Sequence, residues 1–218
     1  MRCLHFDFGA NLRAVVAGHR ARQGASSLPE DEGTRNARPA DPPEHVETSG
    51  NFTPEEIAFL QDVLETGALL EDEHFCLAER ILRAFIKGRG AEQGTCVVLN
   101  GLPRHVGQAR ALDRVLDVQA LVVLECSEST VHRRIEGNVG GDRDHRTDDD
   151  PPAVRRKIEL FEQRTRPLVD HYRRRGTPIQ SVTVAPETTA EEMRRAIEAT
   201  LPGLSPWPRQ PGPSEARA

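Results

Sequence analysis

The residues with the clearest chemical potential follow an apolar run at 97–99. Asn100, Gly101, Pro103 and Arg104 come directly after it. A short apolar run bounded by turn residues indicates a strand buried in a parallel sheet, and ligands of open α/β sheets collect beyond the carboxyl ends of such strands. Gly101 lets the backbone approach a ligand closely, and the planar guanidinium of Arg104 can bind a phosphate or a carboxylate. The alternative is a buried strand followed by a surface arginine.

A second polar segment, 137–150, is rich in Gly, Asp, Arg and His. A connection of about a dozen residues is typical of a lid or of a loose loop, and its glycines permit hinge motion. The Asp and His residues raise the alternative of a metal site, but their spacing fits no EF-hand. We assign no metal ligand here.

The composition excludes several classes of protein. Of the 218 residues, 29% are charged and 4% aromatic, and the net charge is −5. This balance favours a soluble domain with a Leu, Val and Ile core and gives no reason to expect a nucleic-acid partner. No uncharged apolar run approaches a membrane span, and Asp7 and Gly9 interrupt the first apolar residues too early for a signal peptide. We expect a monomeric protein of the cytoplasm that binds no membrane.

The four cysteines are widely spaced, at 3, 76, 96 and 126. None belongs to a Cys-x-x-Cys pair, which excludes a zinc ribbon and a thioredoxin motif. Cys96 and Cys126 lie in or beside apolar runs, so we expect them to be small core residues.

Strands and helices alternate along most of the chain, which predicts an α/β fold with a parallel sheet. Strands are predicted at 4–6, 95–99, 120–124 and 179–184. Capping residues predict where helices begin; they are Asp7, Thr53 with Glu56, Ser127 or Ser129, Asp150, and Thr189 with Glu192. The helix from Asp150 is expected to run unbroken to Gly176. The polar segment 24–50 and the Pro-rich tail 202–218 are expected to be disordered.

Three blocks of sequence carry a resemblance to a known family. The first is Gly9-Ala10-Asn11-Leu12-Arg13, and the second is Leu99-Asn100-Gly101-Leu102-Pro103-Arg104 with Gln108. The third begins at Arg146-Thr147-Asp148-Asp149 and continues at 165–172. In this order and spacing the blocks resemble the adenylate kinase family of nucleoside monophosphate kinases, over residues 3–200 apart from 24–50.

The resemblance implies a P-loop kinase-like core, a parallel sheet with helices on both faces. Residues 1–23 and 91–201 would form this core, and 24–90 would form a small helical lobe that binds the nucleoside monophosphate. Residues 137–150 would be a short lid without the zinc cysteines that some relatives carry. The implied reaction transfers the γ-phosphate of ATP, with Mg²⁺, to AMP or a related monophosphate.

The resemblance also implies roles for individual residues. Arg13 and Arg104 would hold the acceptor's α-phosphate beside Gly9 and Gly101. The base of the acceptor would contact the backbone of Ala68, Leu69 and Leu70 and the side chain of Gln108. The phosphates in transfer would lie among Arg134, Arg146 and Lys157. Asp148 and Asp149 would orient these arginines or tie the lid to the core; the alternative for both is a solvated charge run.

Four positions depart from the family's pattern. Asn100 replaces an Asp that helps to hold Mg²⁺ through water, and a neutral amide is a weaker partner for the ion. Phe8 replaces a Thr that contacts the base. Asn138 and Lys157 replace arginines, and the lysine keeps the charge but loses the bidentate fork.

No Gly-rich loop followed by Lys is present, and the only lysines are Lys87 and Lys157. The family has such a P-loop, after a strand that lies between the counterparts of 95–99 and 120–124. Without them, two strand edges would be unpaired and no lysine would neutralise the β- and γ-phosphates. We therefore expect the chain as printed to be inactive.

Three interpretations remain open from the sequence. The chain can be a kinase whose recorded start is too late, or a non-catalytic relative that binds a nucleotide or a partner protein. The third is a kinase for another acceptor, such as a pyrimidine monophosphate.

Overall fold

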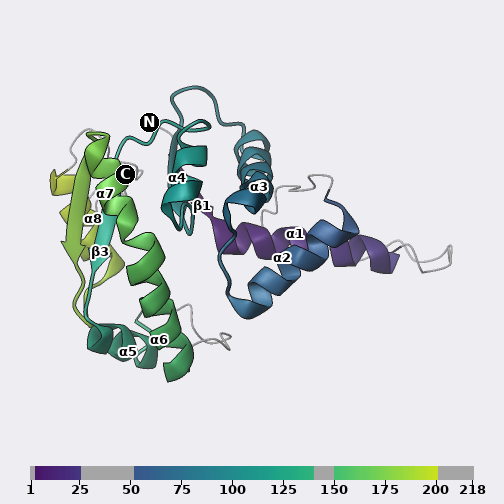
Figure 1. Cartoon of the computed structure of the whole chain (residues 1–218). Coiled ribbons are helices and arrows are strands. Elements are labelled where there is room, and N and C mark those ends of the chain that lie inside the picture. The colour runs from purple at the N-terminus through teal and green to yellow at the C-terminus, as the bar shows by residue number, and fades with distance from the viewer. Residues whose placement is uncertain (1–2, 26–51, 140–149, 201–218) are drawn as a thin grey trace, which may run out of the picture. The chain divides into compact units, whose positions relative to one another are not determined.

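The computed structural model describes residues 3–25, 52–139 and 150–200 (Figure 1). The chain forms two compact units, and their boundary in the sequence lies between Leu102 and Pro103. Apart from residues 24 and 25, the predicted disordered segments lie outside the described residues, as does most of the predicted lid. The division into core, monophosphate lobe and lid stays a prediction.

The first unit contains a pair of parallel strands, β1 (Cys3–Asp7) and β2 (Cys96–Asn100). Helix α1 (Phe8–Ala25) follows β1 directly and packs against α2 (Pro54–Thr66) and α3 (Phe75–Gly88). The short 3₁₀ helix η1 (Asp72–His74) leads into α3. The alternating burial of β1 places Leu4 and Phe6 in the core, where Phe6 contacts Phe85 edge to face at 5.1 Å between ring centroids.

Helix α2 begins and ends where the sequence predicts. The Glu56 amide donates to Thr53 Oγ1 at 3.2 Å, and the Thr53 amide donates to Glu56 Oε2 at 2.9 Å, which confirms the capping box. Pro54 occupies the first turn, where its missing N–H is not needed. Gly67 ends the helix with a left-handed φ of 68°.

The second unit contains another parallel pair, β3 (Leu121–Glu125) and β4 (Ile179–Thr183). Its core contains Ala109, Leu168 and Tyr172, from the two helices that pack together, α4 and α7. The helices of this unit are α4 (Val106–Leu112), α5 (Glu128–Glu136), α6 (Pro151–Leu160), α7 (Pro167–Arg174) and α8 (Ala190–Thr200). Ser127 and Asp150 cap α5 and α6, and the predicted capping box of Thr189 and Glu192 precedes α8.

The prediction of an unbroken helix from Asp150 to Gly176 is wrong in its middle. A π-helical segment, η2 (Phe161–Thr165), separates α6 from α7, although the chain stays helical through it (Figure 1). The amide of Arg166 donates to the carbonyl of Phe161 at 2.8 Å, a spacing of five residues. Pro167 explains the change, because proline lacks the N–H of a regular helix and its ring crowds the preceding turn.

The strands are parallel, as predicted, but less buried than expected. Residues 97–99 of β2 are half-buried, and Val122 and Leu124 of β3 are 38% and 53% exposed. Cys96 is half-buried and Cys126 exposed, so neither is the core residue that the sequence indicates. The physical reason is that each strand has a single hydrogen-bonded neighbour in the described chain, as the sequence predicts for the strands at 95–99 and 120–124.

None of the helices in the described ranges is long enough and apolar enough to span a membrane.

Candidate functional site

The carboxyl ends of β1 and β2 carry a hydrogen-bonded polar pair. Asp7 and Asn100 lie opposite each other in the register of the two strands, and Asn100 Nδ2 donates to Asp7 Oδ2 at 2.8 Å. The other carboxylate oxygen, Asp7 Oδ1, accepts from the Ala10 amide at 2.7 Å. Asp7 therefore caps α1, as predicted, and the dipole of that helix favours its negative charge.

Gly101 turns the chain immediately after this pair. Its φ of 78° lies in the left-handed region, which L side chains rarely adopt. A Cβ at this position would lie 3.4 Å from Phe8 Cβ, so the turn also approaches the start of α1 closely. The backbone conformation therefore favours glycine, whereas the space would admit a methyl group in van der Waals contact with Phe8.

Gly9 leaves room for two charged groups. A Cβ at Gly9 would lie 3.4 Å from Arg13 Nη1 and 3.4 Å from Asp7 Oδ1. The exposed Arg13 side chain thus folds back along the first turn of α1 toward the end of β1. The structure thus brings Gly9 and Arg13 together beside Asp7, and their contact with a monophosphate stays a prediction.

The segment expected to line the base of the acceptor connects α2 to η1. Ala68 is exposed, Leu69 is half-buried, and Leu70 is only 2% exposed. Leu70 therefore anchors the connection in the core of the first unit, while Ala68 is exposed and its amide donates to Thr66 Oγ1 at 3.3 Å. A role in contacting a base stays a prediction.

In the second unit, Arg104 lies in a loop whose backbone is held from two sides. The Arg104 amide donates to Gln108 Oε1 at 2.7 Å, and Thr165 Oγ1 donates to the Arg104 carbonyl at 2.8 Å. Gln108 is 1% exposed, so its side chain supports the loop from within the core. His105, 5% exposed, caps α4 because its Nδ1 accepts from the Gln108 amide at 3.4 Å. Arg104 and Gln108 are thus brought together, with Gln108 on the loop backbone.

The guanidinium of Arg104 is half-buried, and burial lowers its pKa from the ordinary arginine value. An arginine nevertheless remains a cation at neutral pH. Within the described part of the chain, no carboxylate forms an ion pair with this guanidinium. A half-buried positive charge without an acidic partner is a favourable place for an anion.

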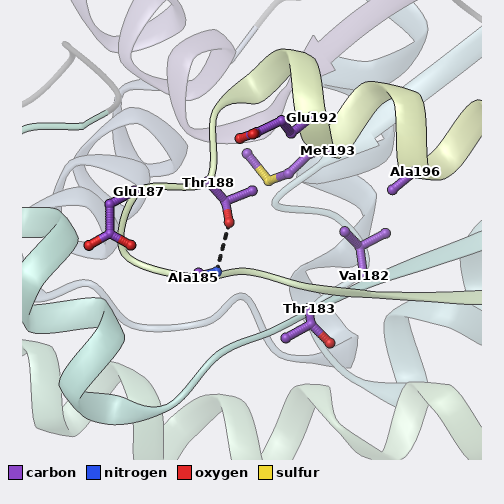
Figure 2. A pocket seen from close by; sticks show the side chains of 8 residues that line it. All are labelled: Val182, Thr183, Ala185, Glu187, Thr188, Glu192, Met193 and Ala196. Atoms are coloured by element: carbon purple, nitrogen blue, oxygen red, sulfur yellow. Dashed lines mark hydrogen bonds between the residues drawn. The ribbon is translucent and has the colours of Figure 1, made fainter.

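Arg134 reaches from α5 to the loop that follows β4. Its Nη1 donates to the carbonyls of Ala185, Pro186 and Thr188 at 3.0, 3.1 and 2.8 Å. The Thr188 hydroxyl in turn accepts from the Ala185 amide at 2.8 Å, as Figure 2 shows. Arg134 therefore orders this loop.

The same loop lines a pocket of about 430 Å³ in the second unit (Figure 2). Two acidic side chains line the pocket, Glu187 from the loop and Glu192 from the start of α8, together with apolar side chains such as Met193 and Ala196 of α8. Its other lining residues are Val182, Thr183, Ala185 and Thr188.

The remaining predicted site residues lie on the second unit or outside the described ranges. Lys157 is exposed on α6. Arg146, Asp148 and Asp149 lie outside the described residues, so their roles stay predictions. Asn138, just after α5, has a left-handed φ of 41°, which asparagine tolerates better than most residues do.

Sequence reasoning missed two supports of this region. One is His105, for which the only sequence signal is a histidine two residues after a proline and directly before a helix. The loop at 185–188 was not connected with Arg134, because nothing in local sequence predicts a contact across about 50 residues.

Asp7 and Asn100 are the groups that could help to hold Mg²⁺. They supply one carboxylate and one amide oxygen, and Mg²⁺ is usually bound through one or two carboxylates, several waters and the phosphates of the substrate. These donors fit the ion in such a water-mediated role. No group of three or more candidate ligands occurs in the described ranges.

Comparison of the sequence with curated proteins finds adenylate kinases. The adenylate kinase of Rhizobium meliloti (strain 1021) is 34% identical over 125 residues, which are 52% of this chain and 62% of that protein. The adenylate kinase of Synechococcus sp. (strain CC9311) is 30% identical over 147 residues, or 65% of this chain and 72% of that protein. The adenylate kinase of Synechococcus sp. (strain WH7803) is 27% identical over 182 residues, which are 81% of this chain and 90% of that protein. No protein-family model matches the sequence.

Parallel strand pairs with helices between them, and a polar cluster where β1 and β2 end, agree with an α/β protein of the P-loop kinase-like class. The chain belongs to the adenylate kinase family, which confirms the resemblance drawn from its motifs. Nucleotide binding, ATP binding and phosphotransfer are thus supported at the level of the family. Since the chain spans 62% of the Rhizobium meliloti relative, its own activity, substrates and partners are matters of proposal.

Proposed function

We propose that this protein is a nucleoside monophosphate kinase that transfers the γ-phosphate of ATP to AMP or to a related monophosphate. It would act as a monomer in the cytoplasm, with Mg²⁺ bound alongside ATP. Family membership supports the reaction class.

The observation that carries the proposal is the environment of Arg104. Its guanidinium is half-buried, it has no ion pair with a carboxylate in the described chain, and its loop is held by Gln108 and Thr165. A positioned guanidinium matches two oxygens of a phosphate with two parallel hydrogen bonds. Arg104 is therefore proposed to bind the phosphate of the monophosphate, and Gln108 to hold the Arg104 loop in place.

Phosphoryl transfer needs positioning and charge neutralisation more than covalent help from the protein. Arg13 would add a second guanidinium for the monophosphate, beside Gly9 and Gly101. Arg134, Arg146 and Lys157 would neutralise the phosphates in transfer, with Asp148 and Asp149 orienting the arginines. The Mg²⁺ that accompanies ATP would neutralise phosphate oxygens, with Asp7 and Asn100 contacting its waters.

The test measures binding and turnover separately. Isothermal titration calorimetry of the chain as printed with AMP should give a saturable heat. ADP formed from ATP, AMP and Mg²⁺ in a coupled assay would support the kinase proposal over the inactivity expected from the missing P-loop lysine. A panel that replaces AMP by CMP, UMP or GMP identifies the acceptor. Absence of both binding and turnover for every monophosphate would contradict the proposal.

The second candidate is a relative that binds a nucleotide or a partner protein without catalysis. It is favoured by Asn100, whose amide nitrogen donates to Asp7, where the resemblance expects an acidic metal partner. Phe8 and Asn138 point the same way, since each replaces a residue that the family uses for contacts to nucleotides. Saturable AMP binding without any ADP formation would support this candidate, and turnover would exclude it.

A further inference from the structure

Cys3 and Cys96 lie directly opposite each other at the amino ends of the parallel strands β1 and β2. Residues paired in this way project from the same face of a sheet, and neighbouring strands lie about 4.8 Å apart. Disulfide-bonded cysteines have Cα atoms about 4.4–6.8 Å apart. The backbone therefore already holds the two residues at a separation that a disulfide requires.

The two thiols also share an environment that differs from that of the other cysteines. Cys3 and Cys96 are half-buried, whereas Cys76 and Cys126 are exposed. Burial, together with the Cys96 thiol hydrogen-bonded beside it, raises the pKa of the Cys3 thiol to about 11. The raised pKa keeps Cys3 protonated near neutral pH, so the pair is expected to react with an oxidant faster as the pH rises.

We propose that Cys3 and Cys96 form an oxidation-sensitive pair, which a hydroperoxide converts into an intramolecular disulfide that links β1 to β2.

The reaction balances with hydrogen peroxide as the oxidant. One thiol loses its proton and attacks a peroxide oxygen; the O–O bond breaks, and a sulfenic acid and water result. The second thiolate then attacks the sulfenic sulfur; the S–O bond breaks, the S–S bond forms, and a second water leaves. Two thiols and one peroxide thus give one disulfide and two waters, and a dithiol reductant reverses the change.

The position of the pair determines the consequence. Cys3 and Cys96 lie at the opposite end of the strands from Asp7 and Asn100, four residues along each strand, or roughly 13 Å at the usual rise. The disulfide would therefore leave the polar pair untouched. It would close a long loop of chain and so stabilise the first unit against unfolding.

The experiment uses the full chain with Cys76→Ser and Cys126→Ser, which removes the two exposed thiols. This double variant is treated with hydrogen peroxide at pH 8, and free thiols, intact mass and thermal midpoint are measured. We expect loss of both thiols, a mass decrease of two hydrogens, a Cys3–Cys96 cross-linked peptide, and a thermal midpoint several degrees higher. Dithiothreitol should restore the starting values.

Two further variants control for folding and chemistry. Cys96→Ser and Cys3→Ser, each in the same background, should keep the reduced protein's circular dichroism but show no rise in midpoint after peroxide. If either variant fails to fold, the cross-linked peptide of the double variant decides alone. Separate oxidation of each thiol to sulfinic or sulfonic acid, or only intermolecular disulfides, would overturn the proposal.

Discussion

At the scale of single residues, Gly101 and Arg104 follow the same strand but respond to different constraints. Gly101 is required by backbone conformation, with a φ of 78° and Phe8 Cβ close to its absent side chain. Arg104 matters for its charge, because its half-buried guanidinium is positioned by a loop whose backbone is held by Gln108 and Thr165. A substitution at each position therefore has a distinct expected readout.

Replacement of Arg104 should weaken monophosphate binding without unfolding the protein. For Arg104→Gln we expect about a 10- to 100-fold increase in the Kd for AMP, because a charge-assisted pair of hydrogen bonds is lost. The Kd of Arg104→Lys should lie between those of Arg104→Gln and the parent protein, since lysine keeps the charge but not the bidentate guanidinium. Titration calorimetry measures all three proteins.

The matched control is Arg110→Gln, which removes the same charge from an exposed position on α4. It should change the Kd by less than about threefold, as expected for a screened surface charge. An equal loss in both variants would show that only the net charge matters.

Replacement of Gly101 should lower stability through the backbone. Gly101→Ala is expected to reduce the free energy of unfolding by about 1–2 kcal/mol because of its left-handed φ, since the new methyl group would meet Phe8 only at ordinary van der Waals distance. Gly176→Ala is the matched comparison, because Gly176 has a φ of 75° and no atom within 4 Å of its ideal Cβ. Urea unfolding should show similar losses for both variants; a much larger loss for Gly101→Ala would contradict the backbone explanation.

At the scale of elements, ion pairs join helices that are distant in sequence. Arg80 Nη1 donates to Glu56 Oε1 at 2.6 Å and ties α3 to the first turn of α2, while the Arg80 guanidinium also lies 4.2 Å from the Phe52 ring centroid. In the second unit, His171 Nε2 lies 3.0 Å from Asp113 Oδ2 and joins α7 to the end of α4. Both contacts are at least partly buried, which makes them worth testing.

The Glu56 contacts predict a dependence of stability on pH. The hydrogen bond from Arg80, and then the one from the Thr53 amide, lower the pKa of Glu56 in the folded protein. A lowered carboxyl pKa contributes stability at pH values above the unfolded pKa, and this contribution is lost as the pH falls through the folded pKa. Glu56→Ala should therefore cost about 1–2 kcal/mol at pH 7, and the difference from the parent should shrink below about pH 4.

Two comparisons separate the cap from the ion pair. Glu56→Gln keeps a side-chain oxygen for the Thr53 amide but loses the charge, so it should cost less than Glu56→Ala. Glu79→Gln removes an exposed pair with Arg83 on α3 and should cost only about 0.3 kcal/mol. A difference that stayed constant from pH 7 to pH 3 would contradict the assignment to Glu56 ionisation.

The contact between α4 and α7 centres on Asp113, which forms ion pairs with His171 and with Arg175. Asp113→Ala leaves the largely buried His171 without its partner and is expected to cost about 1–3 kcal/mol. Asp117→Ala, at an exposed position nearby in sequence, should cost less than about 0.5 kcal/mol. Thermal unfolding followed by circular dichroism measures both, and equal effects would contradict a structural role for Asp113.

At the scale of the whole molecule, the chain divides into two compact units. Leu60 belongs to the core of the first unit and Leu112 to that of the second, and both are fully buried. Each strand pair belongs entirely to one unit, β1 with β2 and β3 with β4. Local stability is therefore expected to differ between the units.

Hydrogen exchange tests whether the local stability of one unit changes without that of the other. Leu60→Ala should lower local stability by about 2–5 kcal/mol and speed exchange in α2, α3 and β1, while β4 and α7 keep the parent's rates. Leu112→Ala should produce the opposite pattern. Mass-spectrometric exchange on the full chain resolves the two regions, and uniform acceleration in both variants would show that the units unfold together.

Local sequence predicts many features of this protein because they depend on neighbouring residues. The capping box at Thr53, the caps at Ser127 and Asp150, and the turn at Gly67 are confirmed, since their hydrogen bonds span only a few residues. The parallel direction of the strands follows from their alternation with helices. The family is also recognisable from Gly9, Arg13, Gly101 and Arg104 with their spacing, and the comparisons confirm it.

Contacts between distant segments required the tertiary structure. Burial of β2 and β3 was overestimated, because apolar composition does not reveal how many neighbours a strand has. The π-helical segment before Pro167, the hold of Arg134 on the 185–188 loop, and the pairing of Cys3 with Cys96 were all absent from local patterns. Sequence by itself determined element type, capping and family, since these follow from short-range chemistry; burial and long-range partners depend on how the chain packs, and only the tertiary structure decided them.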